Sequence, residues 1–435
     1  MTWHIIARIG ALDTYVPDSA GTEPRLITTF EHPSDRDYVP NNVLQTIRDC
    51  TGLEPSPVAL DLLHFAMAVY SADLRINRKH GADRWARDLT LHLPVSDPSL
   101  WMRVTPQLTR TLGFLTGDSW DFEFRTRPPH QAPPLEPVDL PAVDVVSLFS
   151  GGLDSLVGAI DLLARDRCVA LVGHHGAGMT NSVQTGLLKR LTQRFAERLV
   201  PFMFYVQPPR SDADDGEHTM RSRSILFLSL GAAVTATLGG GKRLIVAENG
   251  LISLNVPLTR TRIGSSSTRT THPHFLALFR DFLAAIGIAV HVETPYKFAT
   301  KGEMLRGCAA QEVLRELAPH SMSCSHPEAG RFQGRAPGVH CGYCLPCIIR
   351  RASLDAAGCT QNRYSIDITT SPPANNSDTA RDLRAFQMAL ERLRGAPRMR
   401  YLFDVLGTGP IPPGDAAGYA GVYHRGMEEV RALLG

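Results

Sequence analysis

Hydrophobic and polar residues alternate in four segments near the N-terminus, and this two-residue period predicts half-buried strands. The four segments are residues 3–9, 26–30, 89–95 and 120–124. Residues 58–70 and 99–115 instead carry apolar side chains at the three- to four-residue spacing of a helix. The pattern predicts an α+β domain over residues 1–127, and no motif in it indicates a role.

A proline-rich segment follows, with six prolines between Pro128 and Pro141. It predicts a stiff, extended linker over residues 128–141. Beyond it, short apolar runs alternate with helical segments, and the runs lie at residues 143–149, 168–173, 202–206, 244–247 and 289–292. This alternation predicts an α/β domain over residues 142–360, with helices on both faces of a parallel sheet. Residues 361–435 are predicted to be a helical C-terminal extension, with one helix at about residues 377–394 and no clear pattern after it.

Composition narrows the class of protein. The chain has 435 residues, and its 45 Lys and Arg almost balance 43 Asp and Glu, so a general electrostatic footprint for nucleic acid is absent. The longest apolar stretch, residues 225–238, is too short and too interrupted for a membrane span and predicts a buried helix. The first residues lack the layout of a signal peptide. These features predict a soluble cytoplasmic protein that binds neither membrane nor nucleic acid.

The loops at the carboxyl ends of the predicted strands are where ligands of parallel sheets bind. The first of these loops reads Ser150-Gly151-Gly152-Leu153-Asp154-Ser155 and leads into a helix. Two adjacent glycines allow positive φ and close approach to a ligand, while the unpaired N–H groups of the helix start favour anions. The sequence therefore predicts a phosphate cradle, distinct from the Walker loop because no lysine precedes the serine. The alternative is a plain turn in which Asp154 or Ser155 only caps the helix.

Four of the eight cysteines are Cys324, Cys341, Cys344 and Cys347. A CxxCxxC run with one distant cysteine closes a tetrahedral site and predicts structural zinc in a reducing compartment. An iron–sulfur cluster is the main alternative, although the fourth cysteine of the bacterial ferredoxin run is missing. His326 or His340 could replace Cys324 as the fourth ligand.

The glycine turn and the cysteines together resemble the 7-cyano-7-deazaguanine synthase (QueC) family, in which the motif SGGxDS is the PP-loop of the ATP pyrophosphatases. Residues 221–229, RSRSILFLS, resemble the family's helix with arginine followed by FLS, and residues 294–303, TPYKFATKGE, resemble its TP…TK.E segment. Arg350 follows the cysteine run as in the family. The resemblance covers about residues 143–354 and implies the PP-loop, adenine nucleotide alpha hydrolase-like fold.

The resemblance also implies a site. ATP, with Mg²⁺, is expected at Phe149, Ser150, Gly151, Gly152, Leu153, Asp154 and Ser155. Expected catalytic residues are Asp154, Ser155, Arg223 and Lys301. Glu248, Asn249 and Arg269 lie where the chain departs from the family and are expected, with Arg223, to contact nucleotide or substrate.

These departures and the extra N-terminal domain make the chain more similar to the QueC-like branch of Qat anti-phage defence systems. The branch implies adenylation of a 7-carboxy-7-deazaguanine-like acid, then amide or nitrile formation, with a partner protein as acceptor. Alternatives are a 7-cyano-7-deazaguanine synthase of queuosine biosynthesis and, in another class, an inactive nucleotide-binding zinc scaffold in a complex. A tRNA-modifying enzyme of the same fold would need a basic surface, which the charge does not favour. The oligomeric state stays open between a homodimer and a hetero-complex.

Overall fold

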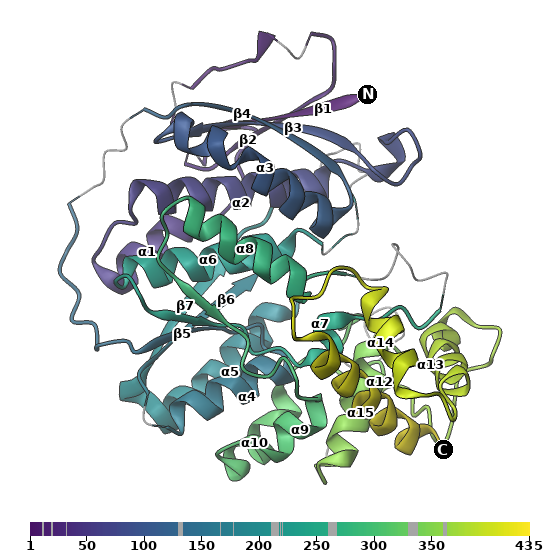
Figure 1. Cartoon of the computed structure of the whole chain (residues 1–435). Coiled ribbons are helices and arrows are strands. Elements are labelled where there is room, and N and C mark those ends of the chain that lie inside the picture. The colour runs from purple at the N-terminus through teal and green to yellow at the C-terminus, as the bar shows by residue number, and fades with distance from the viewer. Residues whose placement is uncertain are drawn as a thin grey trace.

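Two parallel sheets organise the chain. The computed structural model describes residues 1–10, 13–18, 21–31, 33–128, 134–165, 167–176, 178–209, 217, 219, 221–259, 268–328, 338–359 and 363–435. Figure 1 shows the first sheet at the N-terminal end, the second below it, and the C-terminal helices to one side of the second.

The N-terminal sheet has the strand order β2-β1-β3-β4. Its strands are β1 (Thr2–Arg8), β2 (Arg25–Thr29), β3 (Asp88–Val95) and β4 (Ser119–Thr126), as the alternation predicted. Its helices are α1 (Val43–Thr51), α2 (Pro57–Arg75) and α3 (Pro98–Thr116). Proline in the first turn and a serine or aspartate N-cap mark the starts of α2 and α3.

All strand pairs of this sheet are parallel, which is the α/β arrangement rather than the α+β one expected from the sequence. The reason lies in the connections, because α1 and α2 link β2 to β3 and α3 links β3 to β4, so that each strand starts again at the same end of the sheet. Helix α1 was not predicted, because it has nine residues and three buried side chains, which is too short a segment to show a helical period.

The second sheet has the order β7-β6-β5-β8-β9 and is parallel throughout, which confirms the prediction. Its strands are β5 (Val145–Leu148), β6 (Val169–His175), β7 (Leu199–Tyr205), β8 (Arg243–Ile245) and β9 (His291–Glu293). Helices α4 (Leu153–Leu163) and α5 (Thr180–Phe195) cover one face, and α6 (Arg223–Thr237) and α8 (Pro273–Ala285) cover the other. The strand order reverses beside β5, the position where ligands of such sheets bind.

Within the described residues, the other α-helices are α7 (Gly250–Leu254), α9 (Lys301–Arg306), α10 (Gln311–Leu317), α12 (Leu345–Ala356), α13 (Arg381–Arg392), α14 (Arg398–Leu406) and α15 (Ala416–Leu434). Helix α13 corresponds to the one predicted near residues 377–394. Helix α15 was missed although its buried residues Tyr419, Tyr423, Met427 and Val430 have helical spacing, because glycines and alanines between them weaken the pattern.

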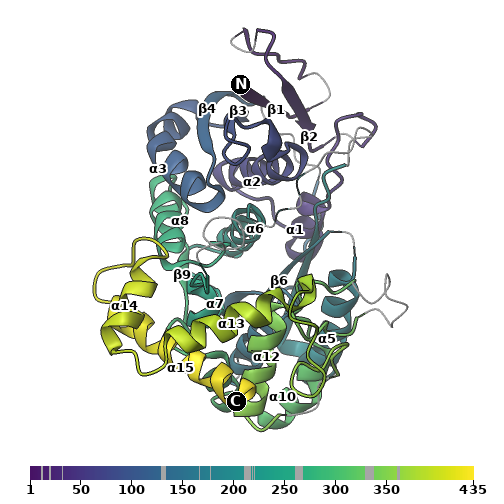
Figure 2. The same ribbon diagram turned by 90° about the vertical axis from the view of Figure 1, so that its right-hand side faces the viewer.

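One hydrophobic core joins the two sheets. It contains Leu62 and Phe65 of α2, Trp101 of α3, Leu226 of α6 and Phe282 of α8. The ring centroid of Phe282 lies 6.0 Å from that of Phe65 and 5.9 Å from that of Trp101. Figures 1 and 2 both show α6 and α8 between the sheets. The predicted boundary at residue 127 thus separates two sheets that share a core, and the division into domains stays a prediction.

Among the described residues, one helix, α2, is long and apolar enough to cross a membrane, and 83% of its apolar stretch is buried inside the protein. It is the core helix between the two sheets. The predicted buried helix at residues 225–238 is α6, with most of its side chains buried.

Candidate functional site

The chain turns sharply between β5 and α4. Gly151 has φ +81°, a left-handed conformation that strains any residue with a Cβ. A Cβ at Gly151 would also lie 3.1 Å from Gln184 Cγ and 3.2 Å from Val183 Cγ1. The conformation favours glycine here, and the packing leaves little room for a side chain.

Hydroxyl and N–H groups gather at the start of α4. Ser150 Oγ accepts a hydrogen bond from Gly152 N (3.2 Å) and lies 3.1 Å from Ser155 Oγ. Ser155 Oγ donates to Gly152 O (3.0 Å), and Leu153 N donates to Ser323 Oγ (3.3 Å). The N-cap residue, Gly152, has no side chain to cap the helix. A helix N-terminus whose N–H groups lie among hydroxyls is suited to an anion.

The turn opens on a cavity of about 400 Å³. The predicted site residues that line it are Ser150, Gly152, Leu153, Asp154, Ser155, Arg223, Glu248 and Lys301. They come from α4, α6, the end of β8 and α9, so the fold brings together segments that are far apart in the sequence. An apolar wall that includes Phe227, Leu228 and Ile252 faces them. Sequence reasoning missed this wall, because apolar residues of a cavity and of a core look alike.

Four predicted site residues lie beside the cavity rather than in its described lining: Phe149, Gly151, Asn249 and Arg269. Phe149 is fully buried in the core beneath the turn. Asn249 caps α7 by accepting a hydrogen bond from Ile252 N (3.0 Å).

Arg269 is held by the N-terminal sheet's helix α3. Its guanidinium lies 4.3 Å from the centre of the Phe114 ring and donates to Phe114 O (2.8 Å). Its neighbours Thr270 and Thr271 line the cavity, and Thr271 Oγ1 is buried without a hydrogen-bond partner. Residues 260–267, which come before this part of the chain, lie outside the described residues.

Asp154 is the most strongly held polar group of the cavity. Its Oδ1 lies 2.7 Å from Lys301 Nζ, and both side chains are buried. Its Oδ2 accepts hydrogen bonds from Asn249 Nδ2 (2.6 Å) and Asn249 N (3.3 Å). Burial alone would raise the pKa of the Asp154 carboxyl, but Lys301 and these hydrogen bonds hold it below its ordinary value. Asp154 is therefore the anion that orients Lys301.

Glu248 presents a second carboxyl to the same cavity and is hydrogen-bonded to Asp154. Burial, followed by the charge of Asp154, raises the pKa of Glu248 well above its ordinary value. Two adjacent carboxyls in one pocket share a proton in this way. Of the two carboxyls, Glu248 is the one whose pKa is raised, because Lys301 stabilises the charge of Asp154.

Arg223 begins α6, and contacts with β6 and α2 fix its position. Its Nη2 donates to His174 O (3.0 Å) at the end of β6. The preceding residue, Ser222, donates its N–H to Asp73 Oδ2 of α2 (3.0 Å). Burial lowers the pKa of Arg223, although a guanidinium stays charged at neutral pH.

His174 is a structural residue at this strand end. Its buried ring packs edge-on against Tyr70 of α2, with centroids 5.6 Å apart. Burial lowers the pKa of His174 to about 3, so the ring is neutral.

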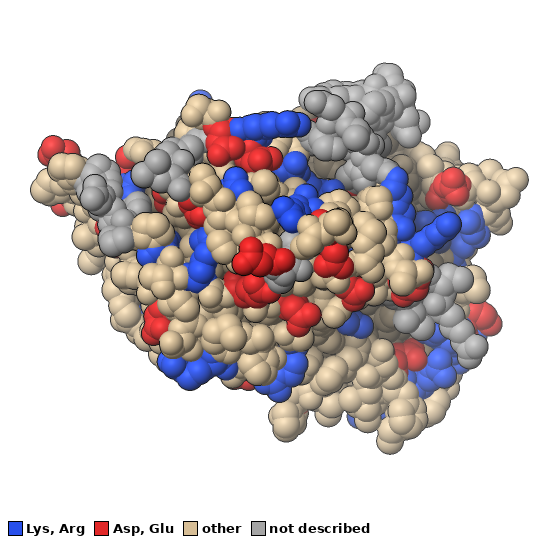
Figure 3. All heavy atoms as spheres, turned by 90° about the horizontal axis from the view of Figure 1, so that it is seen from above, with Lys and Arg blue, Asp and Glu red and all other residues tan. Residues whose placement is uncertain are grey.

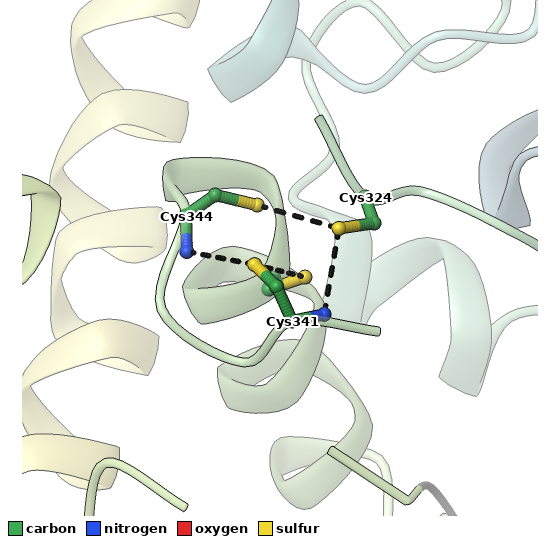
Figure 4. Close-up of side chains that lie close together, drawn as sticks. Cys324, Cys341 and Cys344 are labelled. Carbon is green, nitrogen blue, oxygen red and sulfur yellow. Dashed lines mark hydrogen bonds between the residues drawn. The ribbon is translucent and has the colours of Figure 1, made fainter. Parts of the chain in front are cut away.

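The four predicted metal ligands come together as one cluster. The sulfur atoms of Cys324, Cys341, Cys344 and Cys347 all lie within 4.8 Å of one another. Figure 4 shows Cys324 facing the loop that carries Cys341 and Cys344. Separations are 3.9 Å between Cys324 and Cys344 Sγ and 3.8 Å between Cys341 and Cys347 Sγ. Tetrahedral zinc with Zn–S bonds of about 2.3 Å requires S···S distances of about 3.8 Å, so the cluster fits a single zinc ion.

Neither His326 nor His340 is needed as a fourth metal ligand, because the four cysteines already complete a tetrahedral site. His326 lies beside Cys324, to which its backbone N donates (3.2 Å), and its ring stacks on Tyr343. His340 Nε2 accepts from Ser323 N (3.4 Å), and burial lowers its pKa to about 3. A cluster of several irons would hold the thiolates farther apart than a single ion does, which favours zinc.

A short loop links the cysteine cluster to the glycine turn. The backbone N–H of Met322 donates to the backbone oxygen of Gly151 (2.9 Å). The next residue, Ser323, accepts a hydrogen bond from Leu153 N at its Oγ, and the metal ligand Cys324 follows directly in the sequence. The fully buried Arg350 of α12 donates to Ser323 Oγ (3.3 Å) and holds the loop from behind. The cluster therefore supports the turn and one wall of the cavity. Ser323 was not predicted, and its place next to a metal ligand was the available signal.

Removing the charge of Lys301 should destabilise the protein. In Lys301→Met, Asp154 loses its cation in a buried site, and breaking such a pair from one side costs about 3–5 kcal/mol. Thermal and denaturant unfolding would measure the loss of free energy of unfolding. The matched control is Lys297→Met, whose ion pair with Asp415 is 36% and 22% exposed and should contribute about 1 kcal/mol or less. Equal effects of the two substitutions would contradict the buried pairing.

The chain matches no known protein family, and no curated protein is significantly similar to it in sequence. What the structure shows is an α/β protein with two all-parallel sheets and a buried four-cysteine cluster suitable for zinc. The resemblance to the QueC family rests on the motifs quoted above.

Proposed function

We propose that the cavity binds ATP and that the protein cleaves it to AMP and pyrophosphate, activating a carboxylic acid by adenylation for carbon–nitrogen bond formation. The observation that carries the proposal is the glycine turn at residues 150–155, which opens on a cavity at the strand-order reversal of a parallel sheet. Two cationic side chains, Lys301 and Arg223, line the same cavity.

The chemistry explains why these groups belong together. An amine cannot displace oxide from a carboxylate, whereas AMP is a good leaving group. Adenylation needs cations around the α-phosphate, where negative charge develops, and a cradle that holds the departing pyrophosphate. Lys301 and Arg223 would supply the first, and the N–H groups of α4 the second. The Mg²⁺ that accompanies ATP would add positive charge at the same place.

The proposed substrate is a 7-carboxy-7-deazaguanine-like acid, taken from the family resemblance. The proposed acceptor is an amine of a partner protein in an anti-phage defence system in the cytoplasm. On the face seen in Figure 3, basic and acidic side chains are interspersed, so recognition of a partner through this face would depend on shape as well as charge.

The decisive measurement is the product of ATP turnover. With 7-carboxy-7-deazaguanine present, we expect AMP and pyrophosphate, together with a mass increase on an acceptor protein. An amide or nitrile with free ammonia and no labelled protein would favour the plain synthase. ADP as the main product would contradict the PP-loop assignment, and tight nucleotide binding without turnover would favour the scaffold.

A further inference from the structure

Glu248 differs from Asp154, the other acidic residue of the described cavity lining. It follows the end of β8 and is a half-buried residue of the cavity lining, whereas Asp154 is buried. These two are the carboxyl groups among the described lining residues, and no histidine is found there.

The contacts leave Asp154 little freedom to exchange a proton. One of its oxygens faces Lys301 and the other accepts two hydrogen bonds from Asn249. Glu248 is hydrogen-bonded to this anion and also lines the cavity. Among the described lining residues, the other charged or ionisable groups are Arg223 from α6 and Cys324 from the metal loop.

We propose that Glu248 is the proton acceptor of the carbon–nitrogen bond-forming step. The inference rests on the proposed function. In this step the amine nitrogen attacks the acyl carbon of the adenylate and the C–N bond forms. The bond between that carbon and the phosphate oxygen breaks, its electron pair leaves with AMP, and the proton of the nitrogen moves to the Glu248 carboxylate. The proton then passes to solvent through the cavity mouth, so that no oxidant or further reactant is needed.

The surroundings of Glu248 suit this task. A general base is most effective when its pKa is near the working pH, and an ordinary glutamate is too weak. Burial and the adjacent Asp154 raise the pKa of Glu248. Its carboxylate therefore forms only as pH rises, and the transfer rate should rise with pH through that raised pKa.

Separate assays of the two half-reactions test the inference. In Glu248→Gln, the amide can still donate to Asp154, so folding should be preserved. We expect ATP–pyrophosphate exchange, driven by 7-carboxy-7-deazaguanine, to stay within about threefold of wild type. Amide formation, assayed with whichever amine the wild-type protein accepts (the acceptor protein or ammonia), should fall by about 100-fold or more, and the acidic limb of its pH profile should disappear. The control is Glu293→Gln, at the end of β9, where the carboxylate pairs with Arg243 at the surface.

The outcomes separate the two proposals. If Glu248→Gln exchanges ATP and pyrophosphate at the wild-type rate and also transfers the acyl group at the wild-type rate, the role of Glu248 is overturned and adenylation stands. The same holds if the pH profile of transfer is unchanged in the variant. Absence of acid-dependent exchange in the wild-type protein would overturn the proposed function and this inference with it. Loss of exchange and transfer to the same extent would assign Glu248 to nucleotide binding instead, and thermal unfolding of the variant would show whether misfolding is the cause.

Discussion

Gly151→Val should abolish ATP cleavage in a protein that still folds. Valine at φ +81° strains the backbone by about 1–3 kcal/mol, and its side chain would press on Gln184 and Val183 of α5. The turn must shift, and a displacement of about 1 Å in a reacting site can reduce the rate 100-fold. Pyrophosphate release and calorimetric ATP binding measure the effect.

Gly287 provides a matched control. Its φ is +80°, and a Cβ there would meet no atom within 4 Å. Gly287→Val therefore imposes the same backbone strain away from the cavity, and ATP cleavage should stay close to wild type. If Gly151→Val bound ATP as tightly as wild type, the turn would not be the phosphate cradle.

Loss of the metal should have the second large effect. Elemental analysis of the purified protein should find about one zinc ion per chain, with no visible iron–sulfur absorbance. Structural zinc contributes about 10–16 kcal/mol of binding free energy in small peptides. Cys344→Ser should therefore release the metal, make residues 338–359 sensitive to protease, and reduce ATP cleavage, because Met322 and Ser323 no longer hold the turn.

Cys50→Ser is the control, since Cys50 lies in α1 with its thiol against Pro201 O (3.6 Å), far from the cluster. It should change neither metal content nor protease resistance. A metal-free protein whose residues 338–359 are fully protease-resistant would contradict the zinc site. Stoichiometric iron in the purified protein would show that the cysteines bind iron and not zinc.

The strands and the metal ligands could be predicted because each depends on residues close together in the sequence. Alternation within eight residues identifies β3 and β4, and the CxxCxxC spacing alone brings three thiols together. The glycine turn was predicted for the same reason. The parallel direction of the N-terminal sheet could not be predicted, since alternation specifies a strand but not its neighbour's direction.

The pairings within the cavity required the fold. Lys301 and Asp154 are far apart in the sequence, and nothing local distinguishes their ion pair from two surface charges. Arg269 illustrates the converse. Arg269 was expected to contact nucleotide or substrate, whereas its guanidinium lies on Phe114, and its neighbours Thr270 and Thr271 line the cavity instead.

The core shared by the two sheets limits how the sequence of this protein can change during evolution. Helix α6 presents Arg223 to the cavity on one side and packs on α2 on the other, with Asp73 holding its first turn. The first 127 residues therefore cannot be exchanged between proteins as an independent domain. Any lineage that alters the packing face of α2 must alter α6 with it, so the N-terminal half and the cavity are expected to diversify together.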